Sequence, residues 1–249
     1  MTIAEHSKLA KFYAGRPPYV PRFFKTAAQK LSLSHDSALL DLCCGRGELS
    51  TGFASHCRTI YAVDGSQQML EHSIAGPNIT YLLRDVNNEA VTLPGPVDHI
   101  VIGSAIHWIE PRSLAALIGL NLKDGGKVLV SHTLMKLESQ PWFAALASLN
   151  ADYGKSGEKN FKDLEGADRL QSCGFNRIDG IREVRQARFS VEQLYRSQLS
   201  YLYSEFYRQV SDDLQGYRTR LAELVTPHLD ADGKLSGTLV NWGVIYGRQ

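Results

Sequence analysis

The stretch LLDLCCGRGELS, residues 39–50, constrains the fold of this chain more than any other part of the sequence. An apolar run carries the acid Asp41, and two glycines, Gly45 and Gly47, follow one residue apart. This order predicts a strand, a tight turn and a helix, as at the beginning of nucleotide-binding folds. The glycines allow backbone N–H groups to approach a ligand, and the helix N-terminus favours a carboxylate or a phosphate.

A second apolar run, residues 59–63, ends in Asp64. An acid roughly 20 residues after such a turn meets the ribose hydroxyls in nucleotide-binding units, so Asp64 is the candidate ribose ligand. The dinucleotide fingerprint also has a third glycine, and this chain has Ser50 at that position. NAD and FAD are therefore disfavoured, and an NAD-linked oxidoreductase stays a weaker alternative.

The run Asp41-Leu42-Cys43-Cys44-Gly45-Arg46-Gly47 resembles the first motif of the class I S-adenosylmethionine-dependent methyltransferases. Cys43 stands where the family usually has its first glycine, which could narrow the turn and alter affinity. The resemblance implies a Rossmann-like α/β fold: a seven-stranded, mostly parallel sheet with an antiparallel last strand and helices on both faces. It also implies S-adenosylmethionine as the cofactor, with S-adenosylhomocysteine as its product.

By the same resemblance, residues after the first four strands hold the cofactor. Asp85 would bond the adenine amino group and Val86 would pack on the ring, although an acid at a strand end is by itself more often a turn former. Ser66 is expected to cap the helix that follows the second strand. The cofactor-binding candidates are Asp41, Cys43, Gly45, Gly47, Asp64, Gly65, Ser66, Asp85, Val86, Ser104, Tyr13 and Arg16.

The leader pattern Tyr13-x-x-Arg16-Pro17-x-Tyr19-x-Pro21 resembles a subgroup of these methyltransferases that includes the trans-aconitate type. Prolines break the helical pattern of residues 5–31, which predicts two short helices around a kink. The resemblance implies a lid over cofactor and acceptor. The alternative is a helix pair whose aromatic residues pack on the core, and both can hold together.

The loop after the fourth strand, residues 104–108, should line the pocket, because ligands of doubly wound sheets lie outside the carboxyl ends of the strands. Its His107-Trp108 pair again resembles the trans-aconitate-like subgroup. A hydroxyl or carbon acceptor needs a base, and the candidates are His107 and His132, with His6 on the leader. The plainer interpretation makes His107 a pocket wall. The substrate-binding candidates are Tyr19, His107, Trp108 and Tyr201.

Composition favours a small-molecule partner. The 249 residues carry 27 basic and 26 acidic side chains, and a net charge of +1 gives no field that would gather nucleic acid or an anionic membrane. Residues 1–8 lack the apolar run of a signal peptide, and no stretch predicts a membrane span, so a cytoplasmic protein is expected. The four cysteines show no metal-ligand spacing, so we expect no metal. Monomer and homodimer both stay open.

The predicted organisation is a single methyltransferase domain over residues 1–249. Residues 1–31 form its helical lid, and residues 190–229 form a helical insert that covers the acceptor site. The predicted function is methyl transfer from S-adenosylmethionine to a small molecule, with a carboxylate or hydroxyl acceptor first and nitrogen or carbon also open. The alternative is a protein of this fold that binds the cofactor but catalyses a non-methylating reaction or acts as a binding module.

Overall fold

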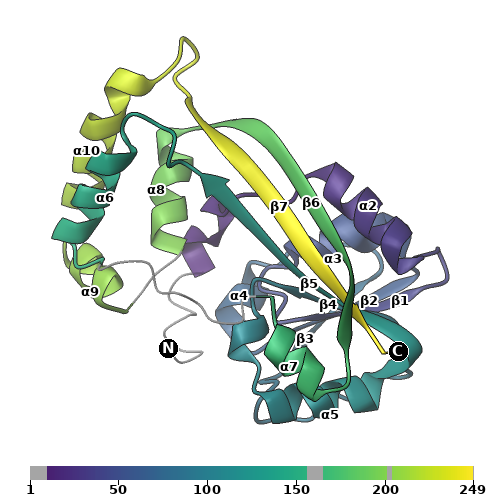
Figure 1. Ribbon diagram of the computed structural model, residues 1–249. Coiled ribbons are helices and arrows are strands. Elements are labelled where there is room, and N and C mark those ends of the chain that lie inside the picture. The colour runs from purple at the N-terminus through teal and green to yellow at the C-terminus, as the bar shows by residue number, and fades with distance from the viewer. Residues whose placement is uncertain (1–9, 156–164, 201–203, 249) are drawn as a thin grey trace. The chain divides into compact units, whose positions relative to one another are not determined.

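The computed structural model describes residues 10–155, 165–200 and 204–248 (Figure 1). These residues form a seven-stranded sheet with the order β3-β2-β1-β4-β5-β7-β6. The strands are β1 (Ala38–Leu42), β2 (Thr59–Asp64), β3 (Ile79–Leu83), β4 (Val97–Gly103), β5 (Leu122–Lys136), β6 (Asn176–Phe189) and β7 (Leu235–Gly247).

The first five strands pair in parallel: β1 with β2 and β4, β2 with β3, and β4 with β5. The last strand, β7, lies between β5 and β6 and runs antiparallel (Figure 1). The predicted mostly parallel sheet with an antiparallel last strand beside the fifth is therefore confirmed. All five residues of β1 are buried, as expected for a central strand with both faces covered.

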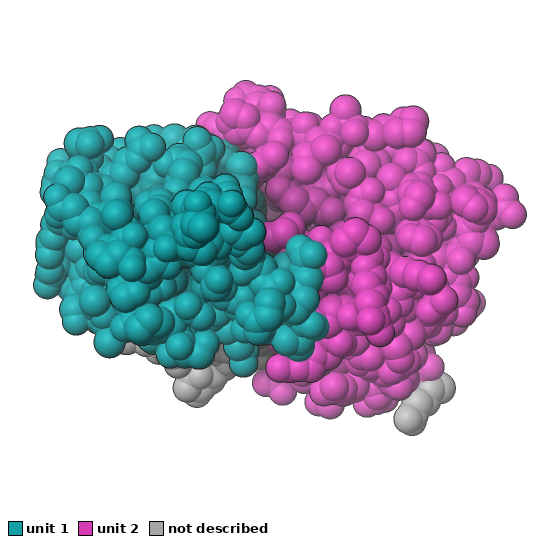
Figure 2. All heavy atoms as spheres, turned by 90° about the horizontal axis from the view of Figure 1, so that it is seen from above, with its two compact units in different colours: residues 1–17, 134–160, 184–240 teal, residues 18–133, 161–183, 241–249 magenta. Residues whose placement is uncertain are grey.

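The chain divides into two compact units, which Figure 2 colours separately. Unit 1 contains residues 1–17, 134–160 and 184–240, and unit 2 contains residues 18–133, 161–183 and 241–249. The division falls inside the predicted leader, between Pro17 and Pro18, and inside β5, β6 and β7. Each unit has its own hydrophobic core.

Unit 2 has helices on both faces of its part of the sheet. Val128 and Val130 of β5 share one core cluster with Leu114 of α5 and Leu170 of α7. Leu129, between the two valines, lies beside Gly243 of β7 on the opposite face, where the rings of α2 and α3 pack. The helices and turns of this unit are α2 (Pro21–Leu31), α3 (Glu48–Phe53), η2 (Ala54–His56), α4 (Gln67–Glu71), η3 (Ile106–Trp108), α5 (Pro111–Asn121) and α7 (Ala167–Ser172).

Unit 1 is mainly helical, and its core surrounds the fully buried Tyr217. An added Cβ at Gly15 would lie only 2.2 Å from Cβ of Arg196, so the first turn packs directly on α8. Figure 1 shows α6, α8, α9 and α10 gathered together. The elements are η1 (Ala10–Gly15), α6 (Phe143–Asp152), α8 (Val191–Ser200), α9 (Ser204–Asp212), α10 (Leu214–Val225) and η4 (Thr226–His228).

Local signals in the sequence placed several boundaries well. In the leader, the first helical turn ends at Gly15 and the next helix begins at Pro21. Proline is tolerated at the first helical position because an N–H there would have no partner within the helix. Ser66 caps α4 and accepts a bond from Met69 N at 3.2 Å, as predicted. The run Asp124-Gly125-Gly126, whose residue types predict a turn, instead lies inside β5, which extends from Leu122 to Lys136. Among the described residues, no helix is long and apolar enough to cross a membrane.

Candidate functional site

The turn after β1 has three alternating residues in the left-handed region: φ is +54° at Cys43, +59° at Gly45 and +88° at Gly47. Glycine adopts this conformation freely, whereas a residue with a Cβ loses about 1–2 kcal/mol. Gly47 then forms the N-cap of α3. The chain thus holds a strained cysteine at the start of the turn, where a glycine would be relaxed.

Asp64 fixes this turn to the end of β2. Its Oδ2 accepts a bond from Gly45 N at 2.8 Å, and its Oδ1 accepts one from Ser66 N at 2.8 Å. The carboxylate is buried, and this burial raises its pKa. Each oxygen keeps a second lone pair, so the carboxylate can hold the backbone and still accept bonds from a ligand's hydroxyls.

Asp41 lies beneath the same turn and is only 1 % exposed. Its Oδ2 accepts bonds from Ser50 Oγ at 2.6 Å and from Ser50 N at 3.1 Å, and desolvation raises the pKa of the carboxyl to about 7. Its Oδ1 is buried and has no hydrogen-bond partner among the residues that the structure describes. A buried oxygen without a partner is costly, so this atom is a natural acceptor for a donor on a ligand.

The residue after β4, like the turn after β1, has a left-handed backbone conformation. Leu42 pairs with Ile102, so these two strands finish side by side, and Ser104 also has a left-handed φ of +54°. Ser104 N donates to Ser131 O at 2.8 Å. Strained non-glycine residues cluster at functional sites. The sheet order also reverses between β1 and β4, the switch point where ligands of open α/β sheets bind.

The turn after β3 uses Asp85 as a turn former. Its Oδ1 accepts a bond from Asn87 N at 3.0 Å and its Oδ2 accepts one from Asn88 Nδ2 at 2.8 Å. Val86, the predicted ring contact, is buried in the core of unit 2. The plainer interpretation of Asp85 therefore describes its contacts in this structure, and its adenine contact stays a prediction.

Asn87 was not selected from the sequence, yet it joins two loops of the site. Its Nδ2 donates to Trp108 O at 2.9 Å, and its Oδ1 accepts a bond from Glu110 N at 2.9 Å. A polar residue two positions after an acid carries no sequence signal for such a bridge. Its partners become visible only when β3 and β4 are in place.

The loop after β4 carries the predicted His107-Trp108 pair in η3. The two rings lie 4.9 Å apart between centroids and are tilted by 45°. Arg169 of α7 donates from Nε to Ile109 O at 3.1 Å and from Nη2 to His107 O at 3.5 Å. The loop backbone is therefore anchored, and Trp108 is 37 % exposed.

His132 lies on β5, in the row that contains Val128 and Val130. Its ring stacks on Trp242 of β7, with centroids 4.9 Å apart and an angle of 25°. The imidazole is buried. Its role as a base stays a prediction, since a ring packed this way also serves as a wall.

Tyr19 lies beside β5 at the level where β4 ends, with its hydroxyl 3.1 Å from Ser131 Oγ, and Ser131 pairs with Gly103. The backbone around it is held by Asn241 of β7, which accepts a bond from Val20 N at 2.8 Å and donates to Pro18 O at 3.0 Å. Asn241 is fully buried, and sequence analysis missed it. An asparagine inside the apolar final strand was the only signal.

The other leader candidates belong to unit 1. The Arg16 guanidinium lies 3.9 Å from the centroid of the Tyr13 ring, and its Nη2 donates to Ser200 O at 3.0 Å. Their cofactor role stays a prediction. Tyr201 and His6 lie outside the described residues.

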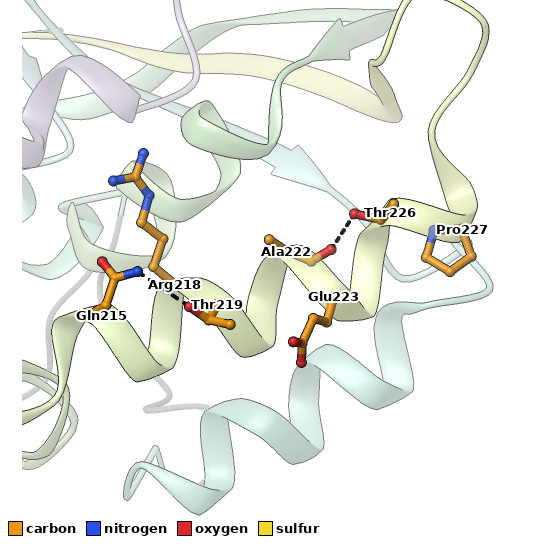
Figure 3. Close-up of a pocket in the computed structure, with 7 residues that line it drawn as sticks. All are labelled: Gln215, Arg218, Thr219, Ala222, Glu223, Thr226 and Pro227. Atoms are coloured by element: carbon orange, nitrogen blue, oxygen red, sulfur yellow. Dashed lines mark hydrogen bonds between the residues drawn. The ribbon is translucent and has the colours of Figure 1, made fainter.

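Two further features carry no candidate chemistry. In the described part of the chain, no group of three or more His, Cys, Asp or Glu residues could hold a metal ion. A pocket in unit 1 is formed by one face of α10 and the turn after it (Figure 3). Its lining residues are Gln215, Arg218, Thr219, Ala222, Glu223, Thr226 and Pro227.

The sheet order, the glycine turn and the acids at the ends of β1 and β2 define a Rossmann-like fold of the class I methyltransferase kind. Residues 39–126 match the family model described as a methyltransferase domain. A solved structure from Anaeromyxobacter dehalogenans, a candidate type II methyltransferase, superposes with a TM-score of 0.66 at 18% identity, covering 94% of this chain and 97% of that one. A methyltransferase from Geobacter sulfurreducens, solved with S-adenosylhomocysteine, superposes with a TM-score of 0.50 at 14% identity. The superposition covers 94% of this chain and 93% of that one.

Curated relatives are also methyltransferases by name. An uncharacterized methyltransferase of Schizosaccharomyces pombe is 30% identical over 108 residues, 42% of each chain. An uncharacterized methyltransferase of Mycobacterium tuberculosis is 27% identical over 128 residues, 51% of each chain. The chain thus spans about half the length of the curated relatives it matches.

Proposed function

We propose that the protein transfers the methyl group of S-adenosylmethionine to a small-molecule acceptor. The observation that carries the proposal is the turn between β1 and α3, which Asp64 ties to β2 at the switch point of the sheet. The match of residues 39–126 to a methyltransferase domain supports it. The leader pattern from Tyr13 to Pro21 further supports membership in the trans-aconitate-like subgroup.

The residues present fit the cofactor. The unpartnered Oδ1 of Asp41 is a buried acceptor next to the turn, suited to a donor such as the cofactor's ammonium. Asp64 keeps lone pairs for the ribose hydroxyls. Gly65, Ser66 and Ser104 follow the ends of β2 and β4 and would complete the wall of the site, with Asp85 and Val86 at the adenine.

Bound S-adenosylmethionine supplies an electrophilic methyl group that an in-line displacement transfers, leaving a neutral thioether. The protein's task is therefore to orient the acceptor and exclude water. Tyr19, His107 and Trp108 would contact the acceptor. A carboxylate acceptor needs no base, whereas for a hydroxyl, His107 or His132 would take the proton.

The helical residues 190–229 would serve as the acceptor cover, with residues 1–31 as the lid. The support is that the described part of residues 190–229 belongs to unit 1, which is mainly helical and has its own core. The near-neutral charge of the chain favours a metabolite over a nucleic acid.

Calorimetric titration with S-adenosylmethionine and S-adenosylhomocysteine, and with NADH as the control ligand, tests the proposal. The matched pair is Asp64→Asn, which replaces one of the two acceptor oxygens at the turn with an NH₂ donor and removes the negative charge, and Asp36→Asn on the exposed loop before β1. We expect the first substitution alone to abolish binding of both sulfur compounds. Binding of NADH in their place, or no binding by the folded protein, contradicts the cofactor. Screening metabolites for a mass gain of one methylene then identifies the acceptor.

A further inference from the structure

We propose that Tyr81 is a positioning residue that holds the glycine turn in its cofactor-binding shape. The inference rests on the proposed function, because it concerns the same turn. Tyr81 lies on β3, the edge strand, which is separated from β1 by β2. Its side chain nevertheless reaches the turn after β1, and no sequence motif marks it.

The Tyr81 hydroxyl lies at the junction of two segments. It donates to Ile74 O at 2.7 Å and lies 3.4 Å from Arg46 O, inside the glycine turn. Ile74 N donates to that same Arg46 carbonyl at 2.9 Å. The hydroxyl thus ties the segment after α4, residues 72–76, to the middle of the turn.

The Arg46 side chain adds a second tie to the same segment. Its Nε donates to His72 O at 3.1 Å. Arg46 is therefore fixed at its carbonyl and at its guanidinium, and it stands between Gly45 and Gly47. The turn cannot change shape without breaking these bonds.

Gly47 shows how closely Tyr81 approaches. An added Cβ there would lie 2.0 Å from the Tyr81 hydroxyl oxygen and 2.9 Å from the ring carbon that bears it. The second glycine of the turn is therefore required by Tyr81 as well as by its φ of +88°. Burial raises the pKa of Tyr81 to about 12, so the hydroxyl keeps its proton at neutral pH.

This brace adds to the bonds that hold the first half of the turn, from Gly45 N to Asp64 Oδ2 and from Cys44 N to Val63 O. α3 is short, ending at Phe53, and the turn contains a strained cysteine. The apparent affinity falls in proportion to the fraction of molecules whose turn has the binding-competent shape. Tyr81 keeps that fraction high, which is preorganisation of the cofactor site.

The test compares Tyr81→Phe, which removes only the hydroxyl, with Tyr61→Phe on the neighbouring strand β2. Calorimetry with S-adenosylhomocysteine is expected to show about five- to ten-fold weaker binding for Tyr81→Phe and a change within about two-fold for Tyr61→Phe. Hydrogen exchange of the Gly47 amide should accelerate in Tyr81→Phe alone. A purely structural role would lower the melting temperature and leave the affinity and this exchange unchanged, which would overturn the inference.

A double-mutant cycle adds a second, independent readout. Gly47→Ala should weaken binding strongly, and Tyr81→Phe in the same chain should restore part of the loss, since the contact to the hydroxyl is gone. Strictly additive losses overturn the inference, and so does equal binding by Tyr81→Phe and the unsubstituted protein. Absence of binding by the unsubstituted protein overturns the proposed function as well, so the two failures are distinguishable. If Gly47→Ala does not fold, the affinity and exchange of Tyr81→Phe decide the question.

Discussion

Gly45 donates its backbone N–H to Oδ2 of Asp64 across 2.8 Å, and this bond joins the turn after β1 to the end of β2. The same carboxylate accepts a bond from Ser66 N through its other oxygen. One side chain therefore fixes two backbone segments of the proposed cofactor site. Its contribution to folding can be separated from its contribution to binding.

Asp64→Asn should lower the free energy of unfolding by about 1–3 kcal/mol without any cofactor present. The amide group can accept at only one of its two positions, so one buried N–H, of Gly45 or Ser66, loses its partner. Urea denaturation measures the effect, with Asp36→Asn as the exposed control. Equal stability of the two variants would show that these bonds contribute nothing to the fold.

Asp41 predicts a pH dependence of the cofactor-free protein. Its carboxyl binds a proton more tightly when folded, because burial raises its pKa from 3.8 to about 7. The contribution of this proton to the free energy of unfolding is fully present below pH about 4. It is lost as the pH rises to about 7, and the total loss is at most about 4 kcal/mol. Asp41→Asn should remove that slope in urea denaturation over this range. An unchanged slope in the variant would contradict the assignment to Asp41.

Asn241→Leu should lower the free energy of unfolding by about 2–4 kcal/mol, because it leaves the buried Val20 N–H and Thr133 hydroxyl without this partner. Hydrogen exchange at Val20 should accelerate as well. Asn121→Leu is the matched control: this asparagine is also buried and bonded, and its side-chain amide donates to Val91 O and Leu117 O. Equal protection of Val20 in both variants would show that the leader is held by other contacts.

Gly15→Ala tests the packing inside unit 1. Its Cβ would lie 2.2 Å from Cβ of Arg196 and 2.7 Å from the α8 backbone, so we expect a loss of about 1–3 kcal/mol in the free energy of unfolding. Gly119→Ala on α5 meets nothing within 4 Å and should stabilise by about 0.5–1 kcal/mol. Thermal unfolding of the two variants should shift in opposite directions. Shifts of the same sign would contradict the close packing of η1 on α8.

The sequence predicted the βα units well because their signals are local. The apolar runs, the glycine spacing and the Ser66 cap each depend on residues near one another, and β1, β2 and α4 follow them closely. The strained backbone at Cys43 and Ser104 lies where the motif and the strand ends indicated a site.

The parts that could not be predicted depend on contacts between distant segments. Asn241 bonds to Val20, and Tyr81 bonds to Arg46. The partners in each pair are far apart in the sequence, so no local sequence pattern predicts either contact. The division into two units likewise follows from which distant segments share a core. The roles of Tyr13 and Arg16 at the cofactor and the chemical class of the acceptor stay predictions.

The bridge made by Asn87 couples two loops that other residues would leave independent. Its amide holds the backbone of Trp108 and Glu110 while its own N–H closes the Asp85 turn. A length change in either loop would therefore be transmitted to the other. Exchanging the loop after β4 should therefore disturb the loop after β3 unless the new loop presents the same backbone C=O and N–H groups to Asn87, so the two loops form a single unit for engineering.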